Sequence, residues 1–297
     1  MTVPEPPRLP GPGGDEPRDA PDADRAQTQA AEAAHSPDLP PVLSRHGAEP
    51  RHPRGLESAE SRHVLDHPAL ASLTGPHARF AERRGRILRY PVDVSPWLAL
   101  PDDPDADDWA DLAALAGPGA EVPLLGFRGE VPADWEITFQ GEGVQLVDYG
   151  LAAAPDPEAI RLGPADVPEI LDLVARTRPG PFEPRTIELG AYLGIRRDGA
   201  LIAVAGERLH PPGYTEISAV CTDPAFRGQG LATRLILAVA HGIRERGETP
   251  FLHTGAGNAN AIRLYESLGF RLRRTTQFLA ARVPERLGEE REAVPVA

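Results

Sequence analysis

The segment from Ile217 to Leu235 most constrains how this chain of 297 residues can fold. Its first six residues alternate between two faces and include β-branched types, which predicts a strand. Asp223-Pro224 ends that strand, because proline lacks the ladder N–H. From Leu231, apolar residues recur at every fourth position, as on one face of an amphipathic helix. The segment therefore predicts a strand, a glycine turn and a long helix.

The glycine turn contains Gly228 and Gly230 directly before the predicted helix. A helix N-terminus offers unpaired N–H groups and the positive end of the helix dipole, so it binds anions. Glycine lets a phosphate approach the main chain closely, and Arg227 can add a charge-assisted contact. The turn is neither a Walker loop nor a G-x-G-x-x-G motif. It predicts a phosphate site of another kind.

Residues 227–232 match the pattern Arg-x-x-Gly-x-Ala, which resembles the acetyl-CoA pyrophosphate loop of the GNAT N-acetyltransferase superfamily. A second motif follows, with Asn258, Ala261 and Tyr265 before a Leu-Gly-Phe turn that ends at Phe270. It resembles the last helix and turn of that superfamily. The two motifs stand in the family's order, and the resemblance covers residues 160–284. It is nearest to the branch with a glycine N-acyltransferase-like C-terminal domain.

The resemblance implies an α/β fold with a mixed sheet, in which the central strand and the next one splay apart around the cofactor. It implies transfer of an acetyl group from acetyl-CoA to a primary amine by direct attack, without a covalent intermediate and without a metal. Exposed main-chain amides near Val220 would then polarise the thioester carbonyl. The implied cofactor-binding residues are Val220, Cys221, Thr222, Arg227, Gly228, Gln229, Gly230, Leu231, Ala232, Thr233 and Asn258.

Two catalytic roles follow from the resemblance. Tyr265 would protonate the departing thiolate, because a phenol with a pKa of about 10 is a weaker acid than a thiol at about 8.5. The competing interpretation of Tyr265 is packing beside Phe270. An amine must also lose a proton, and we expect Glu207 to accept it, with Glu216 and His210 as alternatives. The competing interpretation of Glu207 is an outward-facing strand charge.

Three other features allow a chemical and a plainer interpretation. Cys221 is the only cysteine, so it forms no intrachain disulfide, and an acyl-cysteine relay lacks a histidine at a linked spacing. We expect it to be packed, and His253 likewise. The acidic run at 102–108 has the alternate spacing of a calcium loop, but it lacks the required glycine and final glutamate. We expect it to cap the helix that follows.

The composition limits the class of partner. The net charge is −13 and the pI about 5.2, which disfavours nucleic acid and is compatible with a cationic amine. A run of about 18 apolar residues, as a membrane span requires, is lacking. With no apolar signal core at the start, we expect a cytoplasmic protein, either a monomer or a homodimer.

We predict four parts along the chain. Residues 1–62 contain 12 prolines and no aromatic residue, and we expect a disordered tail. Residues 63–155 form a small α+β unit, which we interpret as a degenerate half-GNAT unit. Residues 156–284 form the N-acetyltransferase domain, and 285–297 a loose tail. Within 63–155 the predicted helices are 70–84 and 108–116, and the predicted strands are 86–92, 122–128, 135–140 and 144–147.

Residues 156–284 carry a more regular pattern. We expect a short strand at 160–162, a helix from Pro164, the start of a second helix at 185–189, and a hairpin that turns at Asp198-Gly199. Two functions of other classes stay open. The domain could be a silent acyl-CoA sensor or scaffold, or it could act on a partner protein that docks on residues 1–62.

Overall fold

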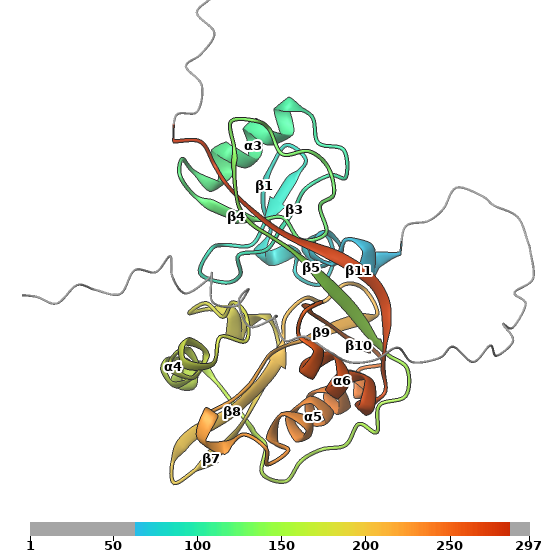
Figure 1. Cartoon of the computed structure of the whole chain (residues 1–297). Coiled ribbons are helices and arrows are strands. Elements are labelled where there is room, and N and C mark those ends of the chain that lie inside the picture. The colour runs from blue at the N-terminus through green and yellow to red at the C-terminus, as the bar shows by residue number, and fades with distance from the viewer. Residues whose placement is uncertain (1–62, 286–297) are drawn as a thin grey trace, which may run out of the picture. The chain divides into compact units, whose positions relative to one another are not determined.

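The computed structural model describes residues 63–285, which are coloured in Figure 1. The predicted tail at 1–62, and all of 285–297 except Glu285, lie outside the described residues. None of the helices within the described range is long and apolar enough to cross a membrane.

An eight-stranded mixed sheet forms the centre of the fold, with the strand order β4-β11-β5-β10-β9-β8-β7-β6. Strands β6 to β9 pair antiparallel in sequence, and β10 then pairs parallel to β9. Asp198 and Gly199 both have positive φ, which confirms the predicted Asp-Gly hairpin. This part comprises β6 (Ile160–Arg161), β7 (Tyr192–Arg197), β8 (Ala200–Glu207), β9 (Tyr214–Thr222) and β10 (Thr249–Gly255).

Helices cover both faces of this sheet (Figure 1). On one face, α5 (Leu231–Glu245) buries Leu235 and Ile243 completely, and α6 (Ala259–Leu268) packs on the same core. On the other face, α4 (Val167–Thr177) packs against β8 at Leu201 and Val204 and against β9 at Ala219 and Cys221. The second helix expected at 185–189 is only a 3-10 turn (Thr186–Leu189), since the chain becomes extended at Gly190.

The last strand of each half of the chain pairs with strands of the other half. Strand β5 (Glu136–Asp148) comes from the first half and lies between β10 and β11. Strand β11 (Phe270–Arg282) comes from the second half and lies between β5 and β4 (Glu121–Pro123). Figure 1 shows β5 and β11 running side by side across the molecule. The predicted unit 63–155 therefore shares its last strand with the sheet of the second half.

The sequence predicts two short strands at 135–140 and 144–147, and this prediction was wrong, because β5 is continuous. We interpreted its glycines as a turn, but they make room for aromatic rings instead. A Cβ on Gly143 would lie 2.7 Å from the ring of Phe278, and one on Gly141 would lie 3.1 Å from the ring of Phe139. Glycine in a strand can mark such a close approach.

The first half also contains a three-stranded antiparallel sheet, β1 (Glu82–Arg84), β2 (Ile87–Arg89) and β3 (Leu98–Ala99). The helix predicted at 70–84 is wrong in extent: α2 (Pro68–Leu73) ends before Gly75-Pro76, and a 3-10 turn and β1 follow. Helix α3 (Ala106–Ala116) confirms the prediction for the acidic run, because the Asp105 side chain caps its N-terminus.

His77 links the two halves of the chain. Its Nε2 lies 3.1 Å from the carbonyl oxygen of Leu189, so Nε2 carries the proton and Nδ1 accepts from the Tyr90 hydroxyl at 2.9 Å. The His77 side chain is buried and faces the ring of His210. Burial, with some repulsion from His210, lowers the pKa of His77 from 6.5 to about 3.

This pKa makes the fold sensitive to acid. Unfolded His77 takes up a proton below pH 6.5, whereas folded His77 resists it down to about pH 3. The free energy of unfolding should therefore be fully supported above pH 6.5 and fall between pH 6.5 and 3, by about 1.4 kcal/mol per pH unit for one proton. Urea unfolding at several pH values should show a shallower fall for His77→Gln. The control His241→Gln alters a half-buried histidine on α5 and should keep the parent slope. An unchanged slope in His77→Gln would contradict the assignment.

Candidate active site

The sheet opens between β9 and β10. Their parallel pairing runs only from Tyr214–Thr249 to Glu216–Phe251, although β9 continues to Thr222 and β10 to Gly255. Beyond Glu216, no strand of residues 63–285 pairs with β9 on this side. Unpaired amides and carbonyls at such a place are available to a ligand. The opening lies beside Val220, where the sequence analysis expects it.

A β-bulge distorts β9 next to the opening. Ser218 pairs with Gly206 and Cys221 with Val204, so β9 has one residue more than β8 in this stretch. Ala219 lies at the extra position of this bulge and has a φ of 53°, which is unusual for a residue with a side chain. The side chain of Val220 packs toward the α5 core, and those of Ala219 and Cys221 pack toward the α4 core. The bulge thus changes the direction of the main chain beside the opening.

The glycine turn before α5 is exposed and open. Gly228 and Gly230 have φ values of 78° and 73°, and a Cβ on either would meet nothing within 4 Å. Glycine is therefore needed for the backbone conformation and not for space. Gly230 is the N-cap of α5, and no side chain among residues 63–285 accepts from the N–H groups of the first turn. This free helix terminus fits a diphosphate.

The residues around the turn are arranged as an anchored loop. Asp223 accepts from the N–H of Ala225 at 2.9 Å and forms an ion pair with Arg176, which fixes the start of the loop. Arg227 is exposed and makes no hydrogen bond or ion pair within residues 63–285. Leu231 is buried in the α5 core. Of the other predicted residues here, Gln229 is exposed, and Thr222, Ala232 and Thr233 are half-buried.

Helix α6 carries the second motif. Asn258 is exposed and caps the helix, since its Oδ1 accepts from the N–H of Ala261 at 3.2 Å. The ring of Tyr265 packs edge-on against Phe270, with 6.0 Å between the ring centroids. The Tyr265 hydroxyl makes no hydrogen bond in the described part of the chain, and burial raises the pKa of Tyr265. Packing and an acid role are therefore compatible for this residue.

Glu207 has an environment that the sequence did not predict. It is buried at the end of β8, not facing outward. One carboxylate oxygen accepts from Arg246 at 2.9 Å, and the other accepts from the N–H of Ala191 at 3.1 Å. His210 lies 3.6 Å from the second oxygen, and burial lowers the pKa of this histidine. Both oxygens of Glu207 are engaged, which favours a structural role.

Glu216 and His253 meet where the parallel pairing of β9 and β10 ends. Arg208 donates to both oxygens of Glu216, at 2.9 and 2.7 Å, and His253 Nδ1 lies 2.7 Å from Oε1. The side chains of Glu216 and His253 are 0% and 4% exposed. Burial would raise the pKa of Glu216, but Arg208 and His253 lower it to about 2. Glu216 is thus held as a carboxylate.

The tautomer of His253 follows from its other neighbour. Arg273 donates to Gln145 Oε1 at 2.8 Å, which fixes the orientation of the amide. Gln145 Nε2 must then donate to His253 Nε2, 3.0 Å away, so His253 carries its proton on Nδ1. The Nε2 lone pair of the neutral ring thus accepts from Gln145, and the Glu216 carboxylate accepts from Nδ1. The sequence places both residues on strands, but only the strand pairing brings them together.

Cys221 is an unsuitable nucleophile. It is buried, and burial raises the pKa of its thiol to about 11, so the thiolate is scarce at neutral pH. Any contribution of Cys221 to cofactor binding would come from its main chain.

Comparison with known proteins identifies the family of this fold and loop. The FR47-like protein family matches residues 192–279. A GNAT-family protein from Novosphingobium aromaticivorans has a crystal structure with 39% sequence identity and a TM-score of 0.68, over 74% of this chain and 98% of that one.

Two curated relatives are named mycothiol acetyltransferase. The protein from Thermomonospora curvata is 38% identical over 112 residues, 36% of each chain. That from Kytococcus sedentarius is 29% identical over 222 residues, which is 70% of this chain and 73% of the relative. The chain thus spans about a third of the first relative and nearly three quarters of the second. Together with the GNAT-family crystal structure, these findings show that the chain belongs to the GNAT family of N-acetyltransferases.

Proposed function

We propose that this protein transfers the acetyl group of acetyl-CoA to a primary amine by direct attack within a ternary complex. The observation that carries the proposal is the combination of an open sheet beside Val220 with a free, glycine-capped helix terminus at Gly230. The opening in the sheet admits an extended pantetheine chain, and the helix terminus binds a diphosphate. Family membership supports the same reaction.

Each residue near the opening has a proposed task. The N–H groups of 228–233 and the guanidinium of Arg227 bind the diphosphate, and Asn258 donates its free amide to the pantetheine. A main-chain N–H at the β9 bulge near Val220 stabilises the developing oxyanion. The hydroxyl of Tyr265 donates a proton to the sulfur that leaves. Acetyl-CoA itself supplies the activated thioester.

The amine needs a proton acceptor, because an alkyl ammonium with a pKa near 10 costs about 4 kcal/mol to neutralise at pH 7. Glu207 stays a candidate, but its two oxygens already have partners. We propose that the amine displaces the hydrogen bond from Gln145, that His253 Nε2 then takes its proton, and that Glu216 stabilises the imidazolium through Nδ1. Arg208 keeps Glu216 ionised for this purpose.

We propose a small-molecule amine as the acceptor, on the strength of the relatives named for mycothiol. The test measures CoA release with a panel of amines: mycothiol without its acetyl group, a polyamine, an amino acid and a peptide N-terminus. Turnover with mycothiol lacking its acetyl group, and with no other amine of the panel, would support the proposal. Turnover only with the peptide would assign the enzyme to protein amines. Acetyl-CoA binding without turnover on any amine would favour the silent sensor.

The phosphate loop gives a testable effect on affinity. Arg227→Gln should weaken acetyl-CoA binding about tenfold or more, because it removes one charge-assisted contact from an otherwise intact loop. Isothermal titration measures the change. The control Arg161→Gln alters another exposed arginine, on β6, and should bind like the parent protein. Equal affinity of the two variants would show that Arg227 does not contact the diphosphate.

A further inference from the structure

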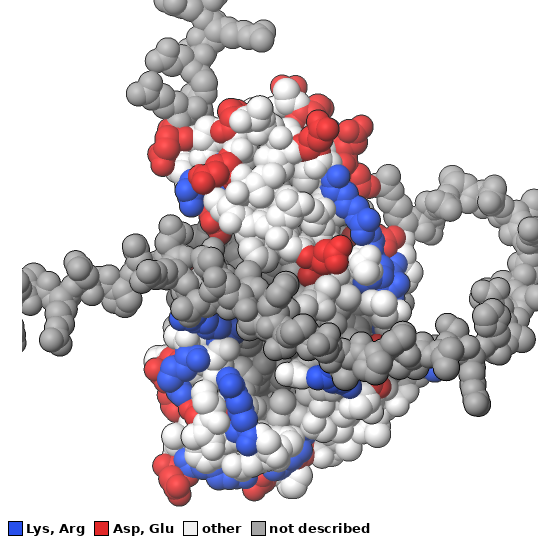
Figure 2. All heavy atoms as spheres, viewed as in Figure 1, with Lys and Arg blue, Asp and Glu red and all other residues white. Residues whose placement is uncertain are grey.

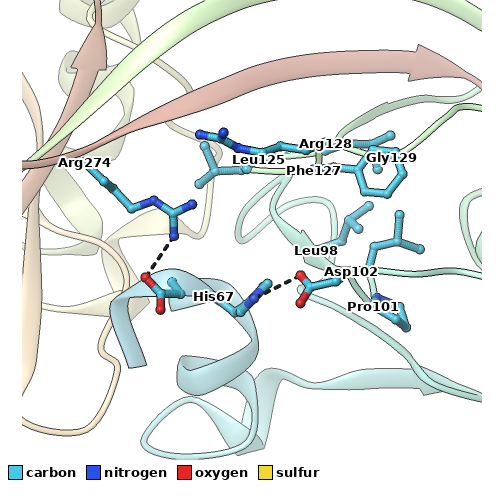
Figure 3. Close-up of a pocket in the computed structure, with 13 residues that line it drawn as sticks. His67, Leu98, Pro101, Asp102, Leu125, Phe127, Arg128, Gly129 and Arg274 are labelled. Carbon is cyan, nitrogen blue, oxygen red and sulfur yellow. Dashed lines mark hydrogen bonds and ion pairs between the residues drawn. The ribbon is translucent and has the colours of Figure 1, made fainter. Parts of the chain in front are cut away.

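A cavity of about 440 Å³ lies in the first half of the chain, away from the glycine turn. Its walls come from β3 and the residues after it, from the segment that follows β4, from the start of α2, and from β11. Figure 3 shows the side chains around it. The lining residues used below are Leu98, Leu124, Phe127, Arg128, His67 and Arg274.

The cavity and the candidate active site occupy corresponding positions in the order of elements of the two halves of the chain. In the second half, an antiparallel meander ends in β9, and α5 then leads to β10. In the first half, the meander β1-β2-β3 is followed by α3 and then by β4. Strands β9 and β10 separate after Glu216, whereas β3 and β4 belong to different sheets. The cavity lies between β3 and the segment that follows β4. The repeated order supports the half-GNAT prediction, which stays a prediction.

The cavity is unsuited to a CoA diphosphate. Helix α3 begins with a capping box in which Asp105 accepts from the N–H of Asp108, so its N-terminus is already occupied. The residues before and within its first turn are acidic, and Figure 2 shows acidic side chains gathered around α3. Negative charge at this position repels a diphosphate, whereas the turn before α5 attracts one.

The charges inside the cavity favour a smaller anion. Arg274 forms an ion pair with Asp66, and Arg273 binds the same carboxylate, so this group keeps one net positive charge. Arg128 is exposed, and it donates to the carbonyl oxygen of Thr275 at 3.1 Å. Figure 3 shows the guanidinium groups of Arg128 and Arg274 on one side of the cavity.

The opposite side of the cavity is apolar. Leu98 and Phe127 lie there in Figure 3, each 7% exposed, and Leu124, which is 1% exposed, also lines the cavity. His67 closes another wall, with its Nε2 3.0 Å from Oδ1 of Asp102. Pockets of this kind bind molecules whose apolar body fills the space while a few polar groups fix the orientation.

We propose that this cavity is a second ligand site, which binds a small carboxylate with an apolar body. The carboxylate accepts hydrogen bonds from Arg128 and Arg274, and the apolar part packs on Leu98, Leu124 and Phe127. The site does not depend on the transferase activity proposed above. It reaches the candidate active site through a chain of hydrogen bonds, from Asp66 through Arg273 and Gln145 to His253.

Isothermal titration of the full chain with hexanoate tests the site, with 1-hexanol as the uncharged counterpart. Saturable millimolar binding of hexanoate is expected, with much weaker binding of hexanol. Arg128→Gln should weaken hexanoate binding about tenfold. Arg83→Gln is the matched control, because Arg83 is also exposed and also donates to one backbone carbonyl, that of Gly85, and it should bind like the parent chain.

A second titration separates the two sites. Hexanoate should bind equally well when the chain is saturated with CoA, whatever becomes of the proposed transferase function. Three results would overturn the proposal: no saturable binding of hexanoate, equal affinity in Arg128→Gln and the parent chain, or displacement of hexanoate by CoA. The last would place the carboxylate in the opening between β9 and β10.

Discussion

Replacing Tyr265 by phenylalanine should lower kcat for acetyl transfer about 100-fold while leaving the affinity for acetyl-CoA unchanged. A positioned general acid typically contributes 10²–10⁴-fold, and a thiolate needs less help than most leaving groups, so we expect the lower end of that range. The fold should tolerate the change, because the ring packs on Phe270 and the hydroxyl makes no hydrogen bond within the described residues.

Steady-state CoA release measures kcat, and titration with acetyl-CoA measures the affinity. Tyr149→Phe is the matched control, because Tyr149 is 69% exposed and its ring stacks under Arg271 away from the opening. A kcat equal to that of the parent enzyme would reduce Tyr265 to a packing residue. A loss of acetyl-CoA affinity together with kcat would instead point to a role in binding.

Glu216→Gln should destabilise the fold by about 3–5 kcal/mol. The substitution removes the charge that compensates Arg208, whose side chain is 9% exposed and stacks on Trp97. Urea unfolding at pH 7 measures the loss. Glu207→Gln is the control: its partner Arg246 is 42% exposed and can return to water, so a loss of about 1 kcal/mol is expected. Equal losses would show that Arg208 is not held by Glu216.

Glu207→Gln and a further variant, His253→Gln, test whether Glu207 or His253 accepts the proton of the amine. His253→Gln keeps a side chain that can donate to Glu216, so it should lose activity by much more than it loses stability. If Glu207→Gln loses more activity than His253→Gln, the acceptor is Glu207 and the sequence-based assignment was the better one. The pH profile of kcat/KM gives independent evidence, because the variant that lacks the base should lose the fall of kcat/KM at acidic pH.

Local signals predicted the part of the fold that holds the cofactor loop. The apolar stripe of α5, the Asp-Gly turn at Asp198 and the cap at Asp105 each depend on residues close in sequence, and each was confirmed. The family motifs added the order of the strands around them. The opening in the sheet was expected from the resemblance, and the pairing of β9 with β10 bears it out.

What could not be predicted depends on distant contacts. The meeting of Glu216 with His253 requires the register of two strands 37 residues apart in sequence, which no local pattern encodes. Glu207 looked like a surface charge because its partners, Ala191 and Arg246, come from other elements. The glycines of β5 indicated a turn, since the rings that cover them stand on β5 itself and on β11.

The pairing of β5 with β11 also affects how the chain can reach its folded state. The partner of β5 along its whole length is made more than a hundred residues later, so the sheet stays incomplete until β11 has been made. Contacts this distant in sequence slow folding. Until β11 arrives, β5 is a thirteen-residue strand with an unpaired edge, the kind of edge that recruits other chains. Of the strands in residues 63–285, the one made last is the one that joins the two halves.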